Sequence, residues 1–295
     1  MNISEKIFSL RKKLHDHNYR YYVLDDPLIS DYDFDMMLKE LEHLENENPE
    51  YFDVNSPTQR VGGSVTKSFI TSVHSTPMYS LDNSYSLEDL KEWEKRIKKI
   101  IETPLEYTCE LKFDGVSINL TYKDGELVRA VTRGDGIKGD DVTNNVKTIP
   151  TVPLKLRGDF KGEFEARGEI VMPISGFNKL NLSRVENGEE PFKNPRNTAS
   201  GSLKLQDSKE VSKRPLDCLL YSVEDSKMFN NHIEFLKNAK SYGFNIYKTY
   251  KHSTSLEEIF EFIQHWEKNR SELPFEIDGV VLKVNDFYQR EIFFL

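Results

Sequence analysis

One strand-like segment constrains the fold and the chemistry of this chain more than any other. It has the sequence Cys-Glu-Leu-Lys-Phe-Asp-Gly-Val and occupies residues 109–116. Strand side chains alternate between two faces, so Glu110, Lys112 and Asp114 project to the same side. Three ionisable groups on one face of an otherwise apolar strand are costly unless they bind something. A lysine flanked by carboxylates and a glycine suits an amine nucleophile that attacks phosphorus, although a charged surface strand ending in a hairpin glycine would show the same pattern.

The first 50 residues predict a helical hairpin. Apolar residues recur at helical spacing in residues 4–23 and 30–47, and Asp26-Pro27 interrupts the pattern between them. Ser30 precedes the second pattern as a candidate N-cap. An irregular linker rich in polar residues and glycine follows the hairpin. We therefore expect a small helical module hinged to a larger body.

Beyond the linker the pattern changes to strands with helices between them. Asp124-Gly125 separates two strand-like runs and is a hairpin signal. The strand-like runs are residues 107–113, 116–122, 127–133, 164–172, 216–223 and 276–284, and helical patterns cover residues 86–101, 175–186, 230–242 and 255–269. Such an arrangement favours an α+β fold. We divide the chain into a helical module with its linker, residues 1–68, and a larger domain with antiparallel sheets and flanking helices, residues 69–295.

Composition excludes several classes of protein. The 295 residues are 37% hydrophobic and 30% charged, and no apolar run is long enough to span a bilayer. Two cysteines without a CxxC pair argue against a zinc ribbon or a disulfide scaffold and fit a reducing compartment. None of the seven histidines forms a pair with metal-ligand spacing, so we interpret them as surface or packing residues. A net charge of −9 is a poor fit to a stand-alone nucleic-acid binder.

A glycine-rich segment is the second candidate feature. Residues 132–141 hold three glycines within six positions, and the backbone N–H groups of such a turn can approach an anion. Arg133 ends the preceding strand and could contact a phosphate or ribose oxygen. A glycine-rich hairpin loop with a solvated arginine would show the same pattern.

Two further charged residues stand in strand-like runs. Glu169 could accept a hydrogen bond from a ribose hydroxyl or hold a metal-bound water, or it could be an edge-strand charge. Lys283 emerges from a continuous Val/Leu run that indicates a buried strand, where an ammonium needs an anionic partner such as a phosphate. An ion pair between Asp278 and a lysine is the alternative. We interpret the polar residues 192–204 as an ordinary loop.

Taken in order, these segments resemble bacterial NAD-dependent DNA ligases. The likeness covers essentially the whole chain, and seven motifs in the same order are far more specific than one. The motifs are Tyr21-Tyr22 with Asp31 and Asp35, Ser80-Leu81-Asp82-Asn83, Glu110-x-Lys112-x-Asp114-Gly115, Thr132-Arg133-Gly134-Asp135-Gly136, Arg167-Gly168-Glu169, Asn194-Pro195-Arg196-Asn197 and Asp278-Gly279-Val280-Val281-x-Lys283. The resemblance implies the N-terminal helical module of those enzymes followed by their adenylation (nucleotidyltransferase) domain, with NAD and Mg²⁺ as cofactors.

The resemblance also implies roles for single residues of the larger domain. Lys112 would be the nucleophile that becomes adenylated. The adenylyl half of NAD would be bound by Ser80, Leu81, Glu110, Arg133, Glu169, Tyr221 and Lys283. Glu110 would hold the adenine, Tyr221 would stack on it, and Lys283 would bind the α-phosphate. No residue is assigned as a metal ligand.

In the helical module the resemblance assigns the nicotinamide mononucleotide (NMN) half of NAD to Tyr21, Tyr22, Asp31 and Asp35. Two positions depart from the family pattern. Phe34 stands where the family usually has a tyrosine, and it falls on the apolar stripe of its helix. Lys204 stands where the family often has an arginine, which would weaken a bidentate contact to a point contact.

The implied reaction is the first step of sealing DNA nicks. Lys112 would attack the adenylyl phosphorus of NAD, form lysine–AMP and release NMN. The amine must first lose its proton, which a nearby cation and desolvation favour. The family continues beyond the point where this chain ends with further DNA-binding domains. We therefore expect little nick sealing by this chain, nicked duplex DNA as a partner of the longer protein, and a monomeric, cytoplasmic protein without membrane contact.

Three alternatives stay open at this point. An ATP-using relative, such as an ATP-dependent ligase, an RNA ligase or a capping enzyme, shares the Lys-x-Asp-Gly motif, but the N-terminal helical hairpin with Tyr21 and Tyr22 speaks against it. A non-catalytic NAD-binding or interaction module would bind NAD without becoming adenylated. The helical hairpin could also be a docking arm without a ligand.

Overall fold

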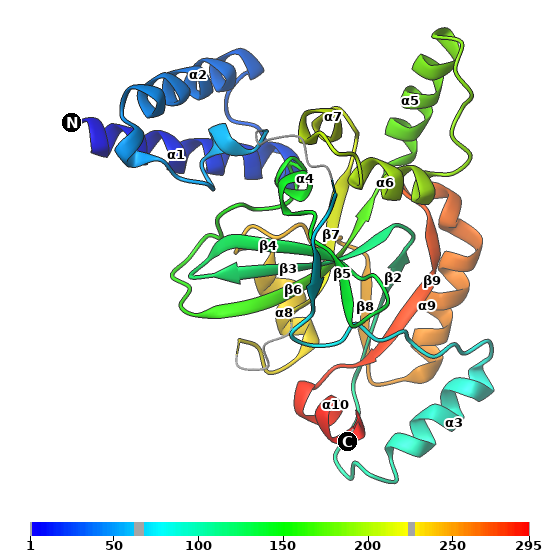
Figure 1. The fold of residues 1–295 in the computed structure, drawn as a ribbon. Coiled ribbons are helices and arrows are strands. Elements are labelled where there is room, and N and C mark those ends of the chain that lie inside the picture. Colours follow the sequence, from blue (N-terminus) through cyan, green and yellow to red (C-terminus); the bar gives the residue numbers. More distant parts are fainter. Residues whose placement is uncertain (1, 62–67, 224–227, 295) are drawn as a thin grey trace.

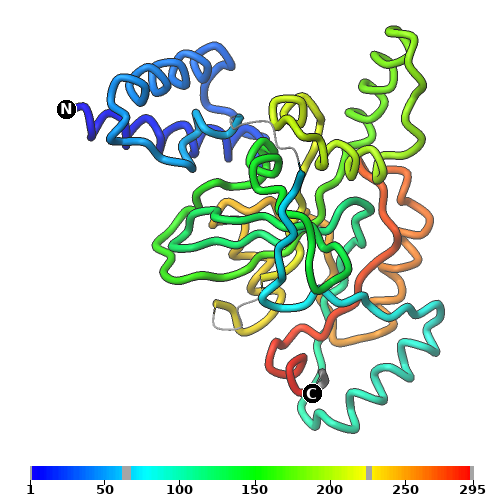
Figure 2. The backbone as a smooth tube through the Cα atoms, in the orientation of Figure 1, coloured from blue at the N-terminus to red at the C-terminus, as the bar shows by residue number. Residues whose placement is uncertain are grey.

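The chain forms a helical module and a larger body of sheets and helices (Figures 1 and 2). The structure is a computed structural model that describes residues 2–61, 68–223 and 228–294. The boundary predicted after residue 68 adjoins residues 62–67, which lie outside the described part. The α+β class predicted from the sequence is confirmed, because helices and antiparallel sheets share the body.

The helical module is the predicted hairpin. Its elements are α1 (Ile3–Tyr19), a π-helical turn (Arg20–Leu24), α2 (Asp31–Glu47) and two 3-10 turns (Pro49–Tyr51 and Pro57–Gln59). Ser30 caps α2 as predicted, because its side chain accepts a hydrogen bond from the N–H of Asp33. The two apolar stripes meet in a core of Ile7, Leu10, Leu14 and Leu41. Phe34 packs against this core, which accounts for its place on the apolar stripe.

Three antiparallel sheets build the body. Their strand orders are β4-β3-β6-β7, β8-β2-β9 and β1-β5. The strands are β1 (Thr71–Val73), β2 (Tyr107–Phe113), β3 (Val116–Lys123), β4 (Glu126–Thr132), β5 (Lys138–Asp140), β6 (Glu163–Val171), β7 (Asp217–Val223), β8 (Tyr250–Ser253) and β9 (Ile277–Val284). The sequence pattern predicts the long strands and misses β1, β5 and β8, because strands of 3 or 4 residues carry too little periodicity.

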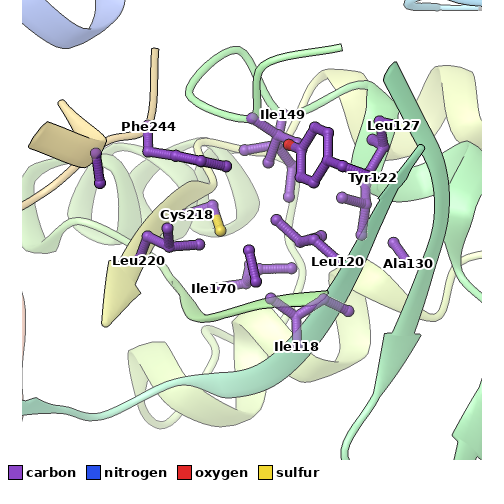
Figure 3. Packing of buried hydrophobic residues seen from close by; sticks show 14 of the residues in the cluster. Ile118, Leu120, Tyr122, Leu127, Ala130, Ile149, Ile170, Cys218, Leu220 and Phe244 are labelled. Carbon is purple, nitrogen blue, oxygen red and sulfur yellow. The ribbon is translucent and has the colours of Figure 1, made fainter. Parts of the chain in front are cut away.

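Helices surround the sheets. They are α3 (Leu87–Ile97), α4 (Thr143–Lys147), α5 (Ile174–Glu186), α6 (Pro195–Leu203), α7 (Ser208–Ser212), α8 (His232–Ala239), α9 (Leu256–Asn269), a 3-10 turn (Arg270–Glu272) and α10 (Phe287–Phe294). One of them, α5, extends away from the body (Figure 1). α8 packs on the four-stranded sheet, whereas α3 and α9 pack on the three-stranded one. Figure 3 shows the larger core, where Leu120, Ile170 and Leu220 of three neighbouring strands lie near Phe244. Within the described residues, no helix has both the length and the apolar character needed to cross a membrane.

Helix α6 shows that the interpretation of residues 192–204 as a loop is wrong. Asn194 is the N-cap and accepts a hydrogen bond from the N–H of Asn197, and Pro195 stands in the first turn. Both are signals for the start of a helix. The small and polar residues that follow form no apolar stripe, so periodicity alone does not reveal the helix.

Two glycines are required where the chain turns between strands. Asp124 and Gly125 have φ of 50° and 79°, so the predicted hairpin turn between β3 and β4 is confirmed. Gly115 links β2 of one sheet to β3 of another, and a Cβ there would lie 2.2 Å from the backbone oxygen of Ile170. The glycine of the Lys-x-Asp-Gly motif is therefore demanded by a close approach of two strands and not by a hairpin.

The helical module docks on the segment that follows α4. The guanidinium of Arg60 donates hydrogen bonds of 2.9, 2.7 and 3.1 Å to the backbone oxygens of Lys147, Ile149 and Val152. In return, Lys147 Nζ donates to the backbone oxygen of Val54 at 3.1 Å. These bonds use backbone groups of the body that no strand or helix satisfies, so they hold the module in the arrangement of this structure.

Candidate active site

A cavity of about 1060 Å³ is lined by strands of both large sheets. Every residue predicted for the adenylyl half of NAD lines it, namely Ser80, Leu81, Glu110, Lys112, Arg133, Glu169, Tyr221 and Lys283. Segments far apart in the sequence thus present their charged and polar side chains to one hollow. The cavity is the candidate active site.

Lys112 stands near the end of β2 and forms an ion pair with Asp278 of β9. Its side chain is 41% exposed, so a molecule in the cavity can reach the ammonium group. The hydrogen bond from Lys112 lowers the pKa of Asp278. The alternative ion pair considered for β9 is therefore present, but its lysine is Lys112 and not Lys283. Before it can act as a nucleophile, Lys112 must leave Asp278 and lose a proton.

Lys283 pairs with Glu110 across two neighbouring strands. Glu110 of β2 faces Val281 of β9, so Lys283 is its diagonal neighbour on the same face. Lys283 Nζ lies 2.7 Å from Glu110 Oε2 and 2.9 Å from the backbone oxygen of Tyr221. The prediction that β9 is a buried strand is wrong, because the strand is half-buried over most of its length. It is an edge strand, and one face of it lines the cavity.

His232, the first residue of α8, joins this pair. Its Nε2 lies 2.5 Å from the same Glu110 Oε2, and its side chain is 1% exposed. Burial alone would raise the pKa of Glu110, but Lys283 and His232 hold it at about 2. Burial, and then the charge of Lys283, lower the pKa of His232 to about 4. At neutral pH the group therefore consists of a carboxylate, an ammonium and a neutral imidazole.

The sequence predicts only a surface or packing role for His232 and misses its contact with Glu110. The two residues are far apart in the chain, and no spacing rule connects them. The sequence of this segment shows only a histidine at the start of an apolar helical stripe. That pattern does not distinguish a histidine that contacts the site from one that packs in the core.

Glu169 lies on β6, which is an internal strand, so the alternative of an edge-strand charge is wrong. Burial raises the pKa of Glu169 to about 7, against the opposing charges of Arg196, Lys112 and Arg133. Arg196 Nη1 also lies 2.9 Å from Asp114 Oδ1. A carboxyl group that titrates near neutral pH can either donate or accept a hydrogen bond, as contact with a ribose hydroxyl requires.

The glycine-rich segment forms a tight turn between β4 and β5, which belong to different sheets. Gly134 has φ of 57°, and a Cβ there would lie 2.0 Å from the backbone oxygen of Lys138. The N–H groups of residues 135–138 donate hydrogen bonds within the turn itself. These four N–H groups are therefore engaged within the turn in this structure, and the approach of the segment's backbone to an anion stays a prediction. Arg133 nevertheless lines the cavity, so its side chain can still reach a phosphate or ribose.

Two residues at the cavity already have partners in the protein. The hydroxyl group of Tyr221 lies 2.7 Å from Ser117 Oγ, and its ring centre lies 5.6 Å from Lys283 Nζ. Lys204, which replaces the arginine common in the family pattern, forms a 2.8 Å ion pair with Asp140. The hydrogen bond fixes the tyrosine ring at the cavity, where it could stack on a base.

The residues predicted for the NMN half of NAD do not line this cavity. These residues are Tyr21, Tyr22, Asp31 and Asp35. The rings of Tyr21 and Tyr22 touch edge to face at 4.8 Å and are about half exposed. Asp31 and Asp35 are exposed as well. The four side chains can therefore receive a ligand, but in this arrangement they are not joined to the cavity of the body.

A Mg²⁺ ion would have to be held partly by substrate. Among the described residues, no three His, Cys, Asp or Glu side chains are grouped as a metal site. Mg²⁺ commonly uses one or two carboxylates together with phosphates and waters. The carboxylates of Asp114, Glu169 and Asp278 line the cavity, and one or two of them would be available as ligands beside a substrate phosphate.

Comparisons with known families define the class of protein. A family described as "NAD-dependent DNA ligase adenylation domain" matches residues 66–294, and one described as "DNA ligase-like, N-terminal NAD+-binding domain" matches residues 1–62. The chain therefore belongs to the NAD-dependent DNA ligase family, with its NAD+-binding and adenylation domains.

Curated relatives extend this result. DNA ligase of Flavobacterium psychrophilum is 59% identical over 99% of this chain. DNA ligases of Christiangramia forsetii and Flavobacterium johnsoniae are 58% and 56% identical over the same share. The chain spans only 44% of the length of each of them. A solved chain titled "Pmar-Lig_Pre." aligns with 84% of this chain and 48% of its own length, at 11% identity and a TM-score of 0.38, which is too weak a likeness to define the fold.

Proposed function

We propose that this chain transfers the adenylyl group of NAD to its own Lys112. The Nζ atom attacks the adenylyl phosphorus, a P–N bond forms, and the P–O bond to NMN breaks. NMN leaves with the electron pair of that bond, and the protons of the amine pass to solvent. The observation that carries the proposal is the accessible Lys112 in a cavity that also holds Lys283 and Arg133.

Catalysis in this proposal depends on an exchange of charge partners. Three cations of the cavity are each paired with a carboxylate of the chain: Lys112 with Asp278, Lys283 with Glu110, and Arg196 with Asp114. The phosphates of NAD would take over these cations. Because phosphoryl transfer is catalysed mainly by positioning and electrostatics, the freed cations then stabilise the charge on the phosphate oxygens. Mg²⁺, when bound, would neutralise further phosphate charge.

The NMN half is proposed to bind the helical module. Since Tyr21, Tyr22, Asp31 and Asp35 do not line the cavity, this proposal requires the module to move over the cavity when NAD binds. NMN would then be held in line with the attacking amine, which the departure of a phosphate requires. We propose that the chain divides into a module of residues 1–68 and a domain of residues 69–295, and the movement would break the hydrogen bonds that Arg60 makes to the body.

The test is the intact mass of the chain before and after incubation with NAD and Mg²⁺. We expect an added AMP on the unchanged chain and none on Lys112→Ala. Lys123→Ala is the matched control, because this exposed lysine lies on the next strand and does not line the cavity. An AMP adduct on Lys112→Ala contradicts the assignment.

The same assay separates the alternatives. An adduct formed from ATP but not from NAD would indicate an ATP-using relative. A rise in melting temperature with NAD and no adduct would indicate a non-catalytic NAD-binding module. If Asp31→Ala uses NAD as well as the unchanged chain does, the helical hairpin is a docking arm.

Nicked duplex DNA is proposed as the substrate of the complete reaction. The chain spans 44% of the length of a DNA ligase to which it is 59% identical, and we propose that the complete reaction uses the remaining segments of such a longer protein as well. We expect the chain, pre-adenylated and mixed with a nicked duplex, to give no sealed product on a denaturing gel. Efficient sealing would show that this part alone is sufficient.

A further inference from the structure

His232 has no assigned role, yet it is held in one position by its surroundings. Its backbone N–H donates to the backbone oxygen of Asn285 at 2.8 Å, and the next N–H, of Ile233, donates to Asn285 Oδ1 at 3.0 Å. Its ring contacts the rings of Phe235 and Phe287. An imidazole held by backbone bonds and aromatic neighbours can fix the position of whatever it hydrogen-bonds.

What it hydrogen-bonds is the carboxylate of Glu110. Glu110 Oε2 receives two donors, His232 Nε2 at 2.5 Å and Lys283 Nζ at 2.7 Å. Lys283 Nζ also lies 3.2 Å from His232 Nε2. Because the carboxylate oxygen is closer and can only accept, we place the proton of the neutral imidazole on Nε2, so the longer contact with Lys283 is not a hydrogen bond in this tautomer. The Nδ1 atom of His232 is buried and finds no hydrogen-bond partner among the described residues, as expected for the bare nitrogen of this tautomer.

This arrangement leaves one oxygen of Glu110 for the cavity. Both side-chain hydrogen bonds to the Glu110 carboxylate go to Oε2, and within residues 2–61, 68–223 and 228–294 its Oε1 accepts no side-chain hydrogen bond. Glu110 itself lines the cavity. An anionic oxygen accepts hydrogen bonds and cannot donate them, so it attracts an amino group and repels a carbonyl oxygen. Adenine carries an amino group at C6, whereas hypoxanthine carries an oxygen there.

A neutral donor on Glu110 also allows Lys283 to leave Glu110 and bind a phosphate. If Lys283 turns toward a phosphate, as the proposed function requires, Glu110 loses its ammonium partner. A buried carboxylate without a donor is costly and would take up a proton. His232 does not compete for phosphate in the same way, because it is neutral and stays on Oε2. Glu110 can therefore remain an anion while Lys283 moves.

We propose that His232 is a positioning residue that holds Glu110 as a hydrogen-bond acceptor for the 6-amino group of adenine, and thereby makes the cavity select adenine over hypoxanthine. The kinetic test of this inference rests on the proposed function, because it measures adduct formation. A second test, of nucleotide binding, does not depend on that function. His232 acts through Glu110 and does not itself touch the nucleotide.

The kinetic test compares NAD with nicotinamide hypoxanthine dinucleotide as adenylyl or inosinyl donor. Single-turnover rates are measured over a range of donor concentrations by intact mass. We expect His232→Leu to lower the preference for NAD by about tenfold, which is the effect of one lost hydrogen bond to a charged group. The change should appear mainly as a higher NAD concentration at half-maximal rate. His232→Gln, which keeps an N–H near the position of Nε2, should retain most of the preference.

Two controls distinguish positioning from a structural role. His252→Leu removes the histidine of another His–Glu pair, 2.9 Å from Glu106 and outside the cavity, and should leave the preference unchanged. Glu110→Gln should abolish the preference, because an amide both donates and accepts, and adding His232→Leu to it should change nothing further. If His232→Leu fails to fold, His232→Asn serves instead. The shorter asparagine amide lies near the position of Nδ1 and does not reach Glu110, so this variant should lose the preference that His232→Gln keeps.

The results that overturn the inference are specific. It is wrong if folded His232→Leu keeps the full preference for NAD, or if the Leu and Gln variants lose it equally. If the unchanged chain forms no adduct, the proposed function fails, and calorimetric binding of AMP and inosine monophosphate decides the inference alone. A preference for AMP that His232→Leu removes supports it, and equal binding of the two nucleotides, or none, overturns it.

Discussion

The ammonium group of Lys283 can be removed to test the electrostatics of the cavity without any ligand. Lys283→Met keeps an unbranched stem but leaves Glu110, which is 6% exposed, with His232 as its remaining partner. The fall in the pKa of Glu110 from 4.5 to about 2 corresponds to about 3 kcal/mol in favour of the folded, charged carboxylate. Lys283 is the first of the groups that lower this pKa, so we assign it the larger share, about 2 kcal/mol at pH 7.

Chemical denaturation at pH 7 measures this loss directly, and thermal melting should show a fall of about 4–8 °C. The matched variant is Lys283→Met combined with Glu110→Met, which removes both charges. Breaking one partner of a buried pair is costly, whereas removing both is often nearly neutral. The double variant should therefore be more stable than the single one. A single variant as stable as the unchanged chain, or a double variant that is no better, would refute the reasoning.

Further predictions concern the docking of the module, the junction of the sheets and the response to acid. Arg60→Met removes three hydrogen bonds to backbone oxygens and should weaken docking by about 2 kcal/mol, seen as a larger radius in small-angle scattering; an unchanged radius counts against the docking contacts. Gly115→Ala places a Cβ 2.2 Å from a backbone oxygen and should cost more than about 2 kcal/mol in denaturation, whereas Gly201→Ala, with open space around it, should cost almost nothing. The pKa of His232 is about 4 when folded against 6.5 ordinarily, so the unfolded chain takes up the proton first and the free energy of unfolding falls as pH drops from about 6.5 to about 4. The pKa of Glu110 is likewise depressed, so its contribution, present above about 4.5, is lost between about 4.5 and 2, and His232→Gln should flatten only the upper part of this pH profile.

The cavity could be anticipated from the sequence because its residues stand in strands with strong local signals. Lys112 and Glu110 share one face of a strand because strand side chains alternate. The turn at Asp124-Gly125 predicts that the strands on either side of it pair antiparallel. The family pattern then joins these strands to Lys283. Each of these inferences uses spacing within one segment or the order of segments.

Features that depend on contacts between distant segments could not be anticipated in this way. His232 meets Glu110 across 122 positions, and no local pattern encodes that meeting. The ion pair of Lys112 with Asp278 spans 166 positions for the same reason. The docking of the module depends on hydrogen bonds from Arg60 to backbone oxygens at and after the end of α4. Every residue has a backbone oxygen, so the sequence does not indicate which of them Arg60 contacts.

The central claim is that Lys112 is the group that receives AMP from NAD. Its most direct measurement is peptide mass spectrometry of the chain after incubation with NAD and Mg²⁺, which locates the adduct on a single residue. The account predicts AMP on Lys112 and an equal amount of released NMN. An adduct on another residue, or NAD turnover by Lys112→Ala, would contradict it.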